Sequence, residues 1–124
     1  MAHPGNRLNK LSAVRHQTKV FEVLVEDQDG RPAKLGGAEM YVTIKASAVD
    51  ETPLVQKTVG DGIEIPDPSK NKAVVTLSTD DTGALEPGGY VYDAWVVFPG
   101  TPPVRQPVVE SAEFEVRRGV TTFA

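Results

Sequence analysis

The sequence contains no cysteine, and its two histidines, His3 and His16, both lie near the N-terminus. Without cysteine the chain cannot form a disulfide framework, a thiolate metal site or a cysteine nucleophile. Two histidines are too few for a multi-histidine metal site within one chain. We therefore expect neither a metal nor a cofactor.

Long hydrophobic runs are also missing. No apolar run approaches the roughly 20 residues that a membrane-spanning helix needs, and the N-terminus lacks the apolar segment of a secretory signal. What the sequence does hold is 124 residues, of which 40% are hydrophobic and 24% are charged. This length and composition are typical of one globular domain. We expect a soluble, unsecreted domain.

The residue types that carry catalysis form no recognisable pattern. No histidine lies beyond position 16, so none of the five serines has a base in the body of the chain for a catalytic triad. The glycine-rich stretches 35–37 and 60–62 do not match a phosphate-binding loop, which opens a long helix. Paired-carboxylate hydrolysis usually needs a cleft lined by aromatic side chains, which make up only 6% of this chain. We expect a protein that is not an enzyme.

Four aspartates lie close to turn residues, at Asp27, Asp29, Asp80 and Asp81. They lack the spacing of an EF-hand calcium loop, because Gly30 stands where a further ligand is needed. Their positions predict turn and cap roles instead, with the second pair capping a single helical turn.

Charge is distributed unevenly along the chain. The first 19 residues contain Arg7, Lys10, Arg15 and Lys19 and no acid, which gives +4, whereas nine basic and all 17 acidic residues give the rest −8. Basic arms often bind nucleic acid. Here the charges are sparse, no aromatic residue is present to stack on bases, and the acidic body repels phosphate. The other interpretations are a solvated tail and an arm that lies on an acidic neighbour, such as another copy of the body.

Short apolar runs separated by turn residues extend along the body of the chain. Residues 39–47 alternate apolar and polar side chains with period two, as a half-buried strand does. No window shows a sustained period of 3.6 residues. The predicted strands are 18–27, 39–47, 54–59, 63–65, 73–79, 90–98 and 108–117. This spacing predicts an all-β, antiparallel sandwich of about seven strands, with one short helical turn and a bulge near Ser111.

The strand pattern also predicts the core. We expect Trp95 to be buried, whereas an exposed Trp95 or Tyr41 would indicate an interface or a sugar platform. Asp93, on the same strand face, should be hydrogen-bonded to the backbone or paired, because an unpaired buried carboxylate is costly. Tyr90 follows a Pro-Gly-Gly turn and should hold a neighbouring turn through its hydroxyl. The expected core residues are Val42, Ile44, Val75, Leu77, Tyr92, Trp95 and Phe114.

The last predicted strand ends at Arg117 and Arg118, before an uncharged tail. Exposed tails and sheet edges are docking surfaces in assemblies, and a frayed terminus is the alternative interpretation. The expected partner-binding residues of the arm and tail are Arg7, Lys10, Arg15, Lys19, Arg117 and Arg118.

The order of the turns and strands resembles that of a known module. The landmarks are Asp29-Gly30-Arg31-Pro32, Leu35-Gly36-Gly37-Ala38, residues 54–63, residues 73–78, Pro87-Gly88-Gly89-Tyr90-Val91-Tyr92-Asp93 and residues 114–118. Together they are similar to the immunoglobulin-like β-sandwich module of tailed bacteriophages and prophages, the type found at the N-terminus of upper baseplate proteins. The resemblance covers about residues 18–121, and its motifs are structural turns and strands. It implies a virion component and no catalytic residues.

With this resemblance the chain divides into a basic arm at 1–17, an immunoglobulin-like sandwich at 18–121 and a tail at 122–124. The arm is longer than the module requires, and no receptor-binding or fibre domain follows Ala124, which favours an adaptor over a direct host-receptor role. The expected function is a non-enzymatic virion component of the tail or baseplate, made in the host cytoplasm. Its expected partners are other virion proteins and further copies of itself, with no membrane and no nucleic acid. A capsid decoration or cement protein and a receptor- or carbohydrate-binding module are the alternatives.

Overall fold

The computed structural model describes residues 10–121, which form eight strands and one short helix. The elements are β1 (Leu11–Val14), β2 (Lys19–Leu24), β3 (Glu39–Lys45), β4 (Val55–Val59), β5 (Gly62–Glu64), β6 (Lys72–Leu77), α2 (Thr79–Gly83), β7 (Gly88–Phe98) and β8 (Val104–Arg117).

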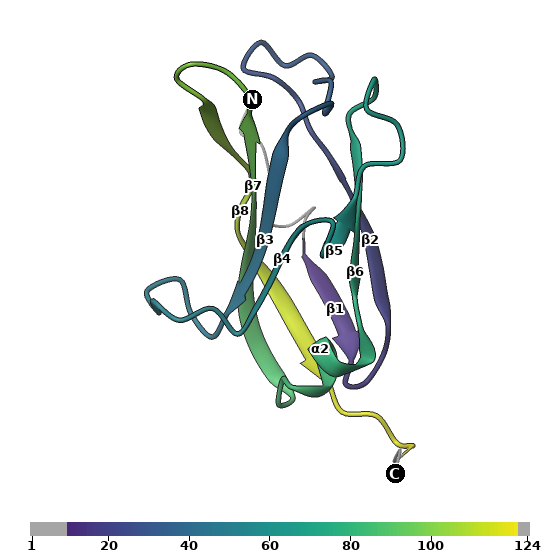
Figure 1. Cartoon of the computed structure of the whole chain (residues 1–124). Helices are drawn as coiled ribbons and strands as arrows, with labels where there is room; N and C mark the ends of the chain where they lie inside the picture. The colour runs from purple at the N-terminus through teal and green to yellow at the C-terminus, as the bar shows by residue number, and fades with distance from the viewer. Residues whose placement is uncertain (1–9, 122–124) are drawn as a thin grey trace.

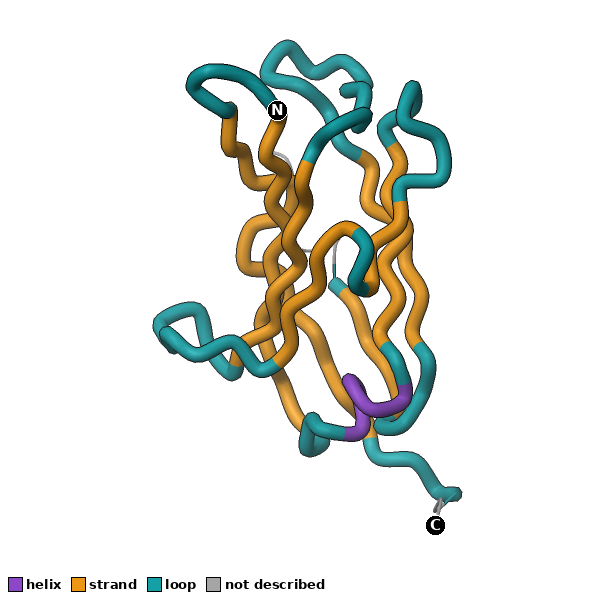
Figure 2. The backbone as a smooth tube through the Cα atoms, viewed as in Figure 1, coloured by secondary structure: helices purple, strands orange, loops and turns teal. Residues whose placement is uncertain are grey.

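The strands form one continuous ladder in the order β1-β8-β7-β3-β4-β5-β6-β2. The ladder folds back on itself, so that β1, β8, β7, β3 and β4 make one layer and β5, β6 and β2 make the other (Figure 1). Two pairings are parallel, β1 with β8 and β4 with β5. The loop 46–54, between β3 and β4, stands away from the strands (Figure 2). The predicted all-β sandwich is confirmed, with eight described strands in place of about seven.

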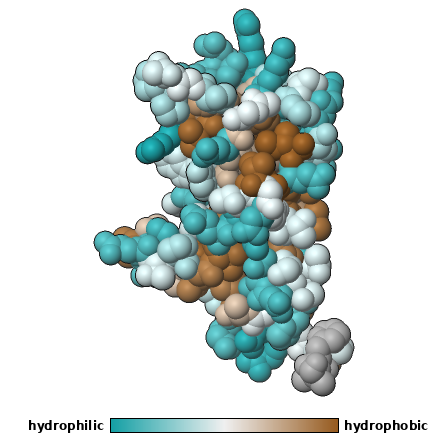
Figure 3. Space-filling view, in the orientation of Figure 1, coloured by the Kyte–Doolittle hydropathy of each residue, from teal (hydrophilic) through white to brown (hydrophobic). Residues whose placement is uncertain are grey.

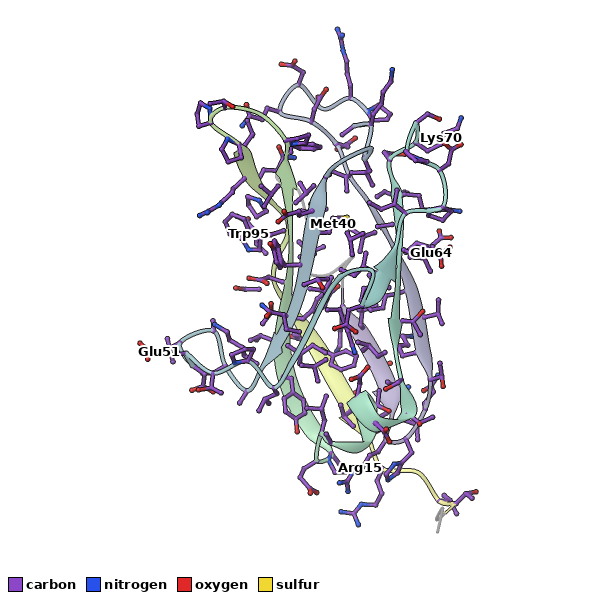
Figure 4. All side chains as sticks on the ribbon, in the orientation of Figure 1. Arg15, Met40, Glu51, Glu64, Lys70 and Trp95 are labelled. Carbon is purple, nitrogen blue, oxygen red and sulfur yellow. The ribbon has the colours of Figure 1, made fainter. Side chains whose placement is uncertain are left out.

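The core lies between the two layers and follows the period-two alternation of the strands. Met40 on β3 is fully buried and points between the layers (Figure 4). The Tyr92 ring meets Phe21 and Phe114 edge-on, with ring centroids 6.1 and 6.4 Å apart. Burial raises the pKa of Tyr92 to about 12. The predicted core residues that are buried are Val42, Ile44, Val75, Leu77, Tyr92 and Phe114.

Trp95 does not belong to the core, and its predicted burial was wrong. The side chain lies on the outer side of β7 (Figure 4) and is 38% exposed. Although β7 is central in its layer, a sandwich of two layers leaves one face of each layer toward solvent. Asp93, on the same outer face, accepts a hydrogen bond from the Trp95 indole at 3.1 Å. Asp93 is thus hydrogen-bonded, but its partner is a side-chain indole and not the predicted backbone group or ion-pair partner.

The predicted arm ends earlier than residue 17, because residues 11–14 form β1. This strand pairs in parallel with the end of β8, with Leu11 opposite Phe114 and Val14 opposite Arg117. Ala13 is buried, with only 1% of its surface exposed. A count of charges does not reveal such a strand, since its pairing depends on backbone groups and on small apolar side chains. The prediction of an extended arm was wrong from Leu11 onward, and residues 1–9 lie outside the described part of the chain.

Side-chain hydrogen bonds hold the predicted turns. The Tyr90 hydroxyl donates to the Glu86 carbonyl oxygen at 2.6 Å, which confirms its expected role. The Asp27 carboxylate accepts the backbone N–H groups of Asp29 and Arg31 at 2.9 and 3.0 Å. This is ordinary aspartate turn chemistry, and it explains why an acid precedes the Asp-Gly turn.

The helix α2 begins with a reciprocal cap. The Ser78 hydroxyl accepts the Asp81 N–H, and the Asp81 carboxylate accepts the Ser78 N–H. Asp81 also forms an ion pair with Lys57 at 2.8 Å, and both side chains are largely buried. Partial burial acts to raise the pKa of the Asp81 carboxyl, but hydrogen bonds from Lys57 and Ser78 outweigh it and hold that pKa below its ordinary value. The predicted helical turn is confirmed, and its N-cap is Ser78.

The last strand, β8, is longer than predicted and contains the expected bulge. The pairing of β7 with β8 slips between Tyr92 and Ala94, and Ser111 takes a positive φ of 40°. Toward its start β8 passes through Pro107, a residue that a central strand rarely tolerates. Here β1 pairs only with residues 114–117 of β8, so the proline lies where this side of the strand has no described neighbour.

Candidate binding face

The basic residues predicted to bind partners contact groups of the same chain wherever the arm is described. The Lys10 ammonium lies 3.3 Å from the Glu113 carboxylate. The Arg15 guanidinium donates to the Gly83 carbonyl oxygen at 3.0 Å and lies 3.4 Å from the Glu86 carboxylate. The described part of the arm therefore lies on the acidic surface of its own body.

The remaining predicted partner-binding residues are at the strand ends. Arg117, at the end of β8, donates to the Ser12 hydroxyl at 3.2 Å and so holds β1 beside β8. Lys19 is half-buried at the start of β2, and Arg118 is exposed just beyond β8. Arg7 lies outside the described residues. Their role in binding partners stays a prediction.

A groove of about 950 Å³ lies on the outer face of β4, β3, β7 and the start of β8, and we call it the outer-face groove. Glu51 and Pro53 of the loop 46–54 border one side, and Pro99 and Pro103 of the turn between β7 and β8 border another. In the orientation of Figure 1, apolar residues reach the surface over the strands, whereas the ends of the loops are mostly hydrophilic (Figure 3).

Two aromatic side chains line this groove from adjacent strands. Tyr41 on β3 and Trp95 on β7 are direct cross-strand partners. The Tyr41 hydroxyl donates to the Glu39 carboxylate at 2.7 Å, and the Trp95 indole N–H donates to the Asp93 carboxylate at 3.1 Å. Both rings are therefore tied to their own strands through their polar atoms.

The Glu39 carboxylate also sets the protonation of its neighbour. Its hydrogen bond to the Tyr41 hydroxyl, and then its negative charge, raise the pKa of Tyr41 above the ordinary value of 10.0. The phenol acts as a hydrogen-bond donor to this carboxylate.

Polar side chains surround the aromatic pair. The Gln56 amide donates to the Thr43 hydroxyl at 3.2 Å, which orients both groups beside the groove. Lys45 and Arg105 add two positive charges to the lining. The groove thus combines aromatic side chains with hydrogen-bond donors and acceptors, and with charged side chains of both signs.

Between residues 10 and 121, no group of three or more His, Asp or Glu side chains could hold a metal ion. In the same range no helix has the length and apolar character to cross a membrane.

A second hollow, of about 650 Å³, lies between β2 and the first half of β8, and we call it the seam groove. Leu11, Phe21, Val23 and Val108 supply apolar lining. At its rim the Gln106 amide donates to the Glu26 carbonyl oxygen and so joins the two layers. The seam groove runs along β2, which is an end strand of the ladder.

The sequence pointed to Tyr41 and Trp95 as a binding surface only if they proved to be exposed, and it did not predict the groove that they line. The alternation on β3 placed Tyr41 with Thr43 and Lys45 on one face, and this face is indeed the solvated one. The β7 segment is apolar on both sides apart from Asp93, and this charge was the one local signal that the Trp95 face is solvated. The register that places Trp95 opposite Tyr41 could not be read from either segment alone.

Comparison with known proteins adds no family. No family model matches the chain, and no curated protein matches it. Among solved structures, the chain is similar to AggA, the major subunit of aggregative adherence fimbriae type I from Escherichia coli. The identity is 16%, the match covers 86% of this chain and 89% of that chain, and the TM-score is 0.34. A similarity this low does not bear on function.

Proposed function

We propose that this protein is a non-enzymatic structural component of a tailed-bacteriophage virion, an adaptor or surface protein of the tail or baseplate. The order of turns and strands over residues 18–121 supports the phage assignment, since it resembles the virion module. A capsid decoration or cement protein is the alternative location for the same role. In both cases the chain is made in the host cytoplasm and ends in the virion.

The open edge of β2 is the observation that supports the assembly role. The Val25 N–H donates to the Asn71 carbonyl oxygen at 2.9 Å, on the side of β6. In an antiparallel ladder alternate residues face opposite neighbours. The backbone groups of Val20, Glu22 and Leu24 therefore point away from β6, where the ladder of described strands ends. Unpaired N–H and C=O groups at an edge are a template for a strand of another chain.

The side chains of this edge fit the same role. Val20 is 54% exposed and Leu24 is 62% exposed, although both are apolar. Glu22, Glu26 and Asp27 line the seam groove next to this edge. An extended segment with apolar and basic residues, from a neighbouring virion protein or another copy, complements this surface in both charge and polarity.

The virion assignment is tested on purified tailed particles from the strain that encodes the chain. We expect the protein to remain with the particles through density-gradient purification, in a fixed ratio to the tail-tube or capsid protein. The ratio also separates a tail location from capsid decoration, because the two structures have different copy numbers. Absence of the chain from intact particles contradicts the proposal.

The role of the β2 edge is tested with the double variant Val20→Lys/Leu24→Lys. Its matched control is Thr76→Lys on β6, an exposed residue that is the cross-strand partner of Val20 but lies away from the edge. We expect the double variant to fold but to be depleted from particles, whereas the control is incorporated normally. Equal incorporation of both variants shows that the edge is not used.

A carbohydrate- or receptor-binding module is the second candidate, and the exposure of Trp95 beside the half-buried Tyr41 favours it. The two functions are compatible, since a virion protein can hold its neighbours by one layer and present the other. Nucleic-acid binding through the arm is disfavoured, because Lys10 and Arg15 already face carboxylates of the same chain.

A further inference from the structure

The rings of Tyr41 and Trp95 are prepared for stacking before any ligand arrives. Each ring is held by a hydrogen bond to the carboxylate two residues away on its own strand, at 2.7 Å for Tyr41 and 3.1 Å for Trp95. Their polar hydrogens are thus already satisfied by the protein. What the pair offers to a ligand is apolar ring surface on a rigid sheet, and little conformational entropy is lost on binding.

Groups around the rings supply hydrogen bonds in several directions. Gln56 and Thr43 lie on one side of the outer-face groove, and Arg105 lies on β8 at another. The carboxylates of Glu39 and Asp93 each accept one hydrogen bond from a ring, which leaves acceptor positions on both. A ligand with many hydroxyl groups matches this set of donors and acceptors.

The charges of the groove nearly cancel. Glu39, Glu51 and Asp93 oppose Lys45 and Arg105, which leaves a net charge of −1 in the lining. A strongly anionic or cationic ligand would meet repulsion from part of this ring of charges as well as attraction. Charge complementarity therefore favours a ligand that is polar but uncharged.

We propose that the outer-face groove binds an uncharged oligosaccharide, with the apolar faces of its sugar rings stacked on Trp95 and Tyr41. Sugar rings combine apolar C–H faces with equatorial hydroxyls, and the groove combines ring surface with donors and acceptors in the same way. This inference rests on the second candidate function above, and it commits that candidate to a neutral glycan. The loop 46–54 and the Pro99–Pro103 turn border the bound chain.

The composition of the chain provides a direct assay. Trp95 is the single tryptophan, so intrinsic fluorescence reports on the groove alone. Purified full-length protein is titrated with maltohexaose, cellohexaose, chitohexaose and mannohexaose at up to millimolar concentration. We expect a saturable change in tryptophan emission with one or more of these probes. Heparin and polylysine serve as the anionic and cationic comparisons.

Two variants test the residues, with binding measured by calorimetry because one of them lacks the fluorophore. Trp95→Ala should lower the affinity for the active probe by about tenfold or more, since the stacking surface of the indole is lost. Val59→Ala is the matched control, because it also removes an exposed apolar side chain but does not line the groove. We expect it to bind as the wild type does.

Three outcomes overturn the proposal: no saturable response to any neutral probe from folded protein, a response to heparin or polylysine alone, and binding that Trp95→Ala leaves unchanged. None of them affects the virion role, which is measured by the composition of purified particles. Conversely, absence of the protein from particles does not change the result of the glycan titration, so a failure of either proposal can be distinguished from a failure of the other.

Discussion

Tyr41 and Trp95 face each other across β3 and β7, and their hydrogen bonds run in opposite directions along the outer face. The Tyr41 hydroxyl reaches back to Glu39, while the Trp95 indole reaches back to Asp93. Because the two strands are antiparallel, Glu39 lies at one end of the aromatic pair and Asp93 at the other. The pair is thus flanked by one carboxylate on each side, which holds both rings against the sheet without burying them.

The surface position of Trp95 predicts a small effect on stability. We expect Trp95→Ala to lower the free energy of unfolding by about 1–2 kcal/mol, because more than a third of the side chain is already in water. Phe114→Ala is the comparison, since Phe114 is 1% exposed and touches Tyr92. It should cost about 3–4 kcal/mol. Urea unfolding followed by far-UV circular dichroism measures both, and equal losses would contradict the exposed placement of Trp95.

Because β1 is part of the sandwich, substitutions at adjacent positions of this strand should differ strongly in their effect on stability. Ala13→Glu places a carboxylate at a fully buried site, and we expect a loss of several kcal/mol or a failure to fold. Ser12→Glu is the matched control, because Ser12 is partly exposed and contacts Arg117. It should be nearly neutral. If thermal unfolding shows the two variants to be equally stable, residues 11–14 do not form a strand of the core in solution.

The ion pair of Lys57 with Asp81 predicts a dependence of stability on pH. The pKa of Asp81 is lower in the folded state than its ordinary value of 3.8, so the folded protein favours the charged carboxylate. The resulting stabilisation is present above that ordinary value and is lost as the pH falls through the lower folded pKa. We expect Asp81→Asn to cost about 1 kcal/mol at pH 7.

The same two proteins compared at low pH provide the control for this ion pair. In acid well below 3.8, wild type and Asp81→Asn should have the same stability, because the wild-type carboxyl is then neutral too. Urea unfolding across the acid range measures the difference. A difference that stays constant down to the lowest pH would mean that the ion pair contributes nothing.

The Tyr90 hydroxyl predicts a modest loss on its removal. Tyr90→Phe should lower the free energy of unfolding by about 1 kcal/mol, because it leaves the Glu86 carbonyl oxygen without this 2.6 Å hydrogen bond. Tyr41→Phe provides the comparison, since its partner Glu39 is exposed and can turn to water. A cost for Tyr90→Phe no larger than that for Tyr41→Phe would show that the turn does not depend on the hydroxyl.

Local features were predicted well. The Asp27 turn, the bulge at Ser111 and the helical turn after Ser78 each depend on a few neighbouring residues, and each is present in the structure. The alternation around Val42 also identified the buried face of β3 correctly. A binding face was predicted only as an alternative, which applied if Trp95 or Tyr41 proved to be exposed.

The sequence by itself determined the fold class, the positions of most strands and the absence of a recognisable catalytic pattern. Period-two alternation, turn residues and residue types are local properties, so they can be read along the chain. Only the tertiary structure decided that β7 has a solvated face and that Leu11–Val14 pairs with the end of β8. Both outcomes depend on how many layers form and on which distant strands become neighbours. Such contacts join residues far apart in the chain, and no pattern within a single segment specifies them.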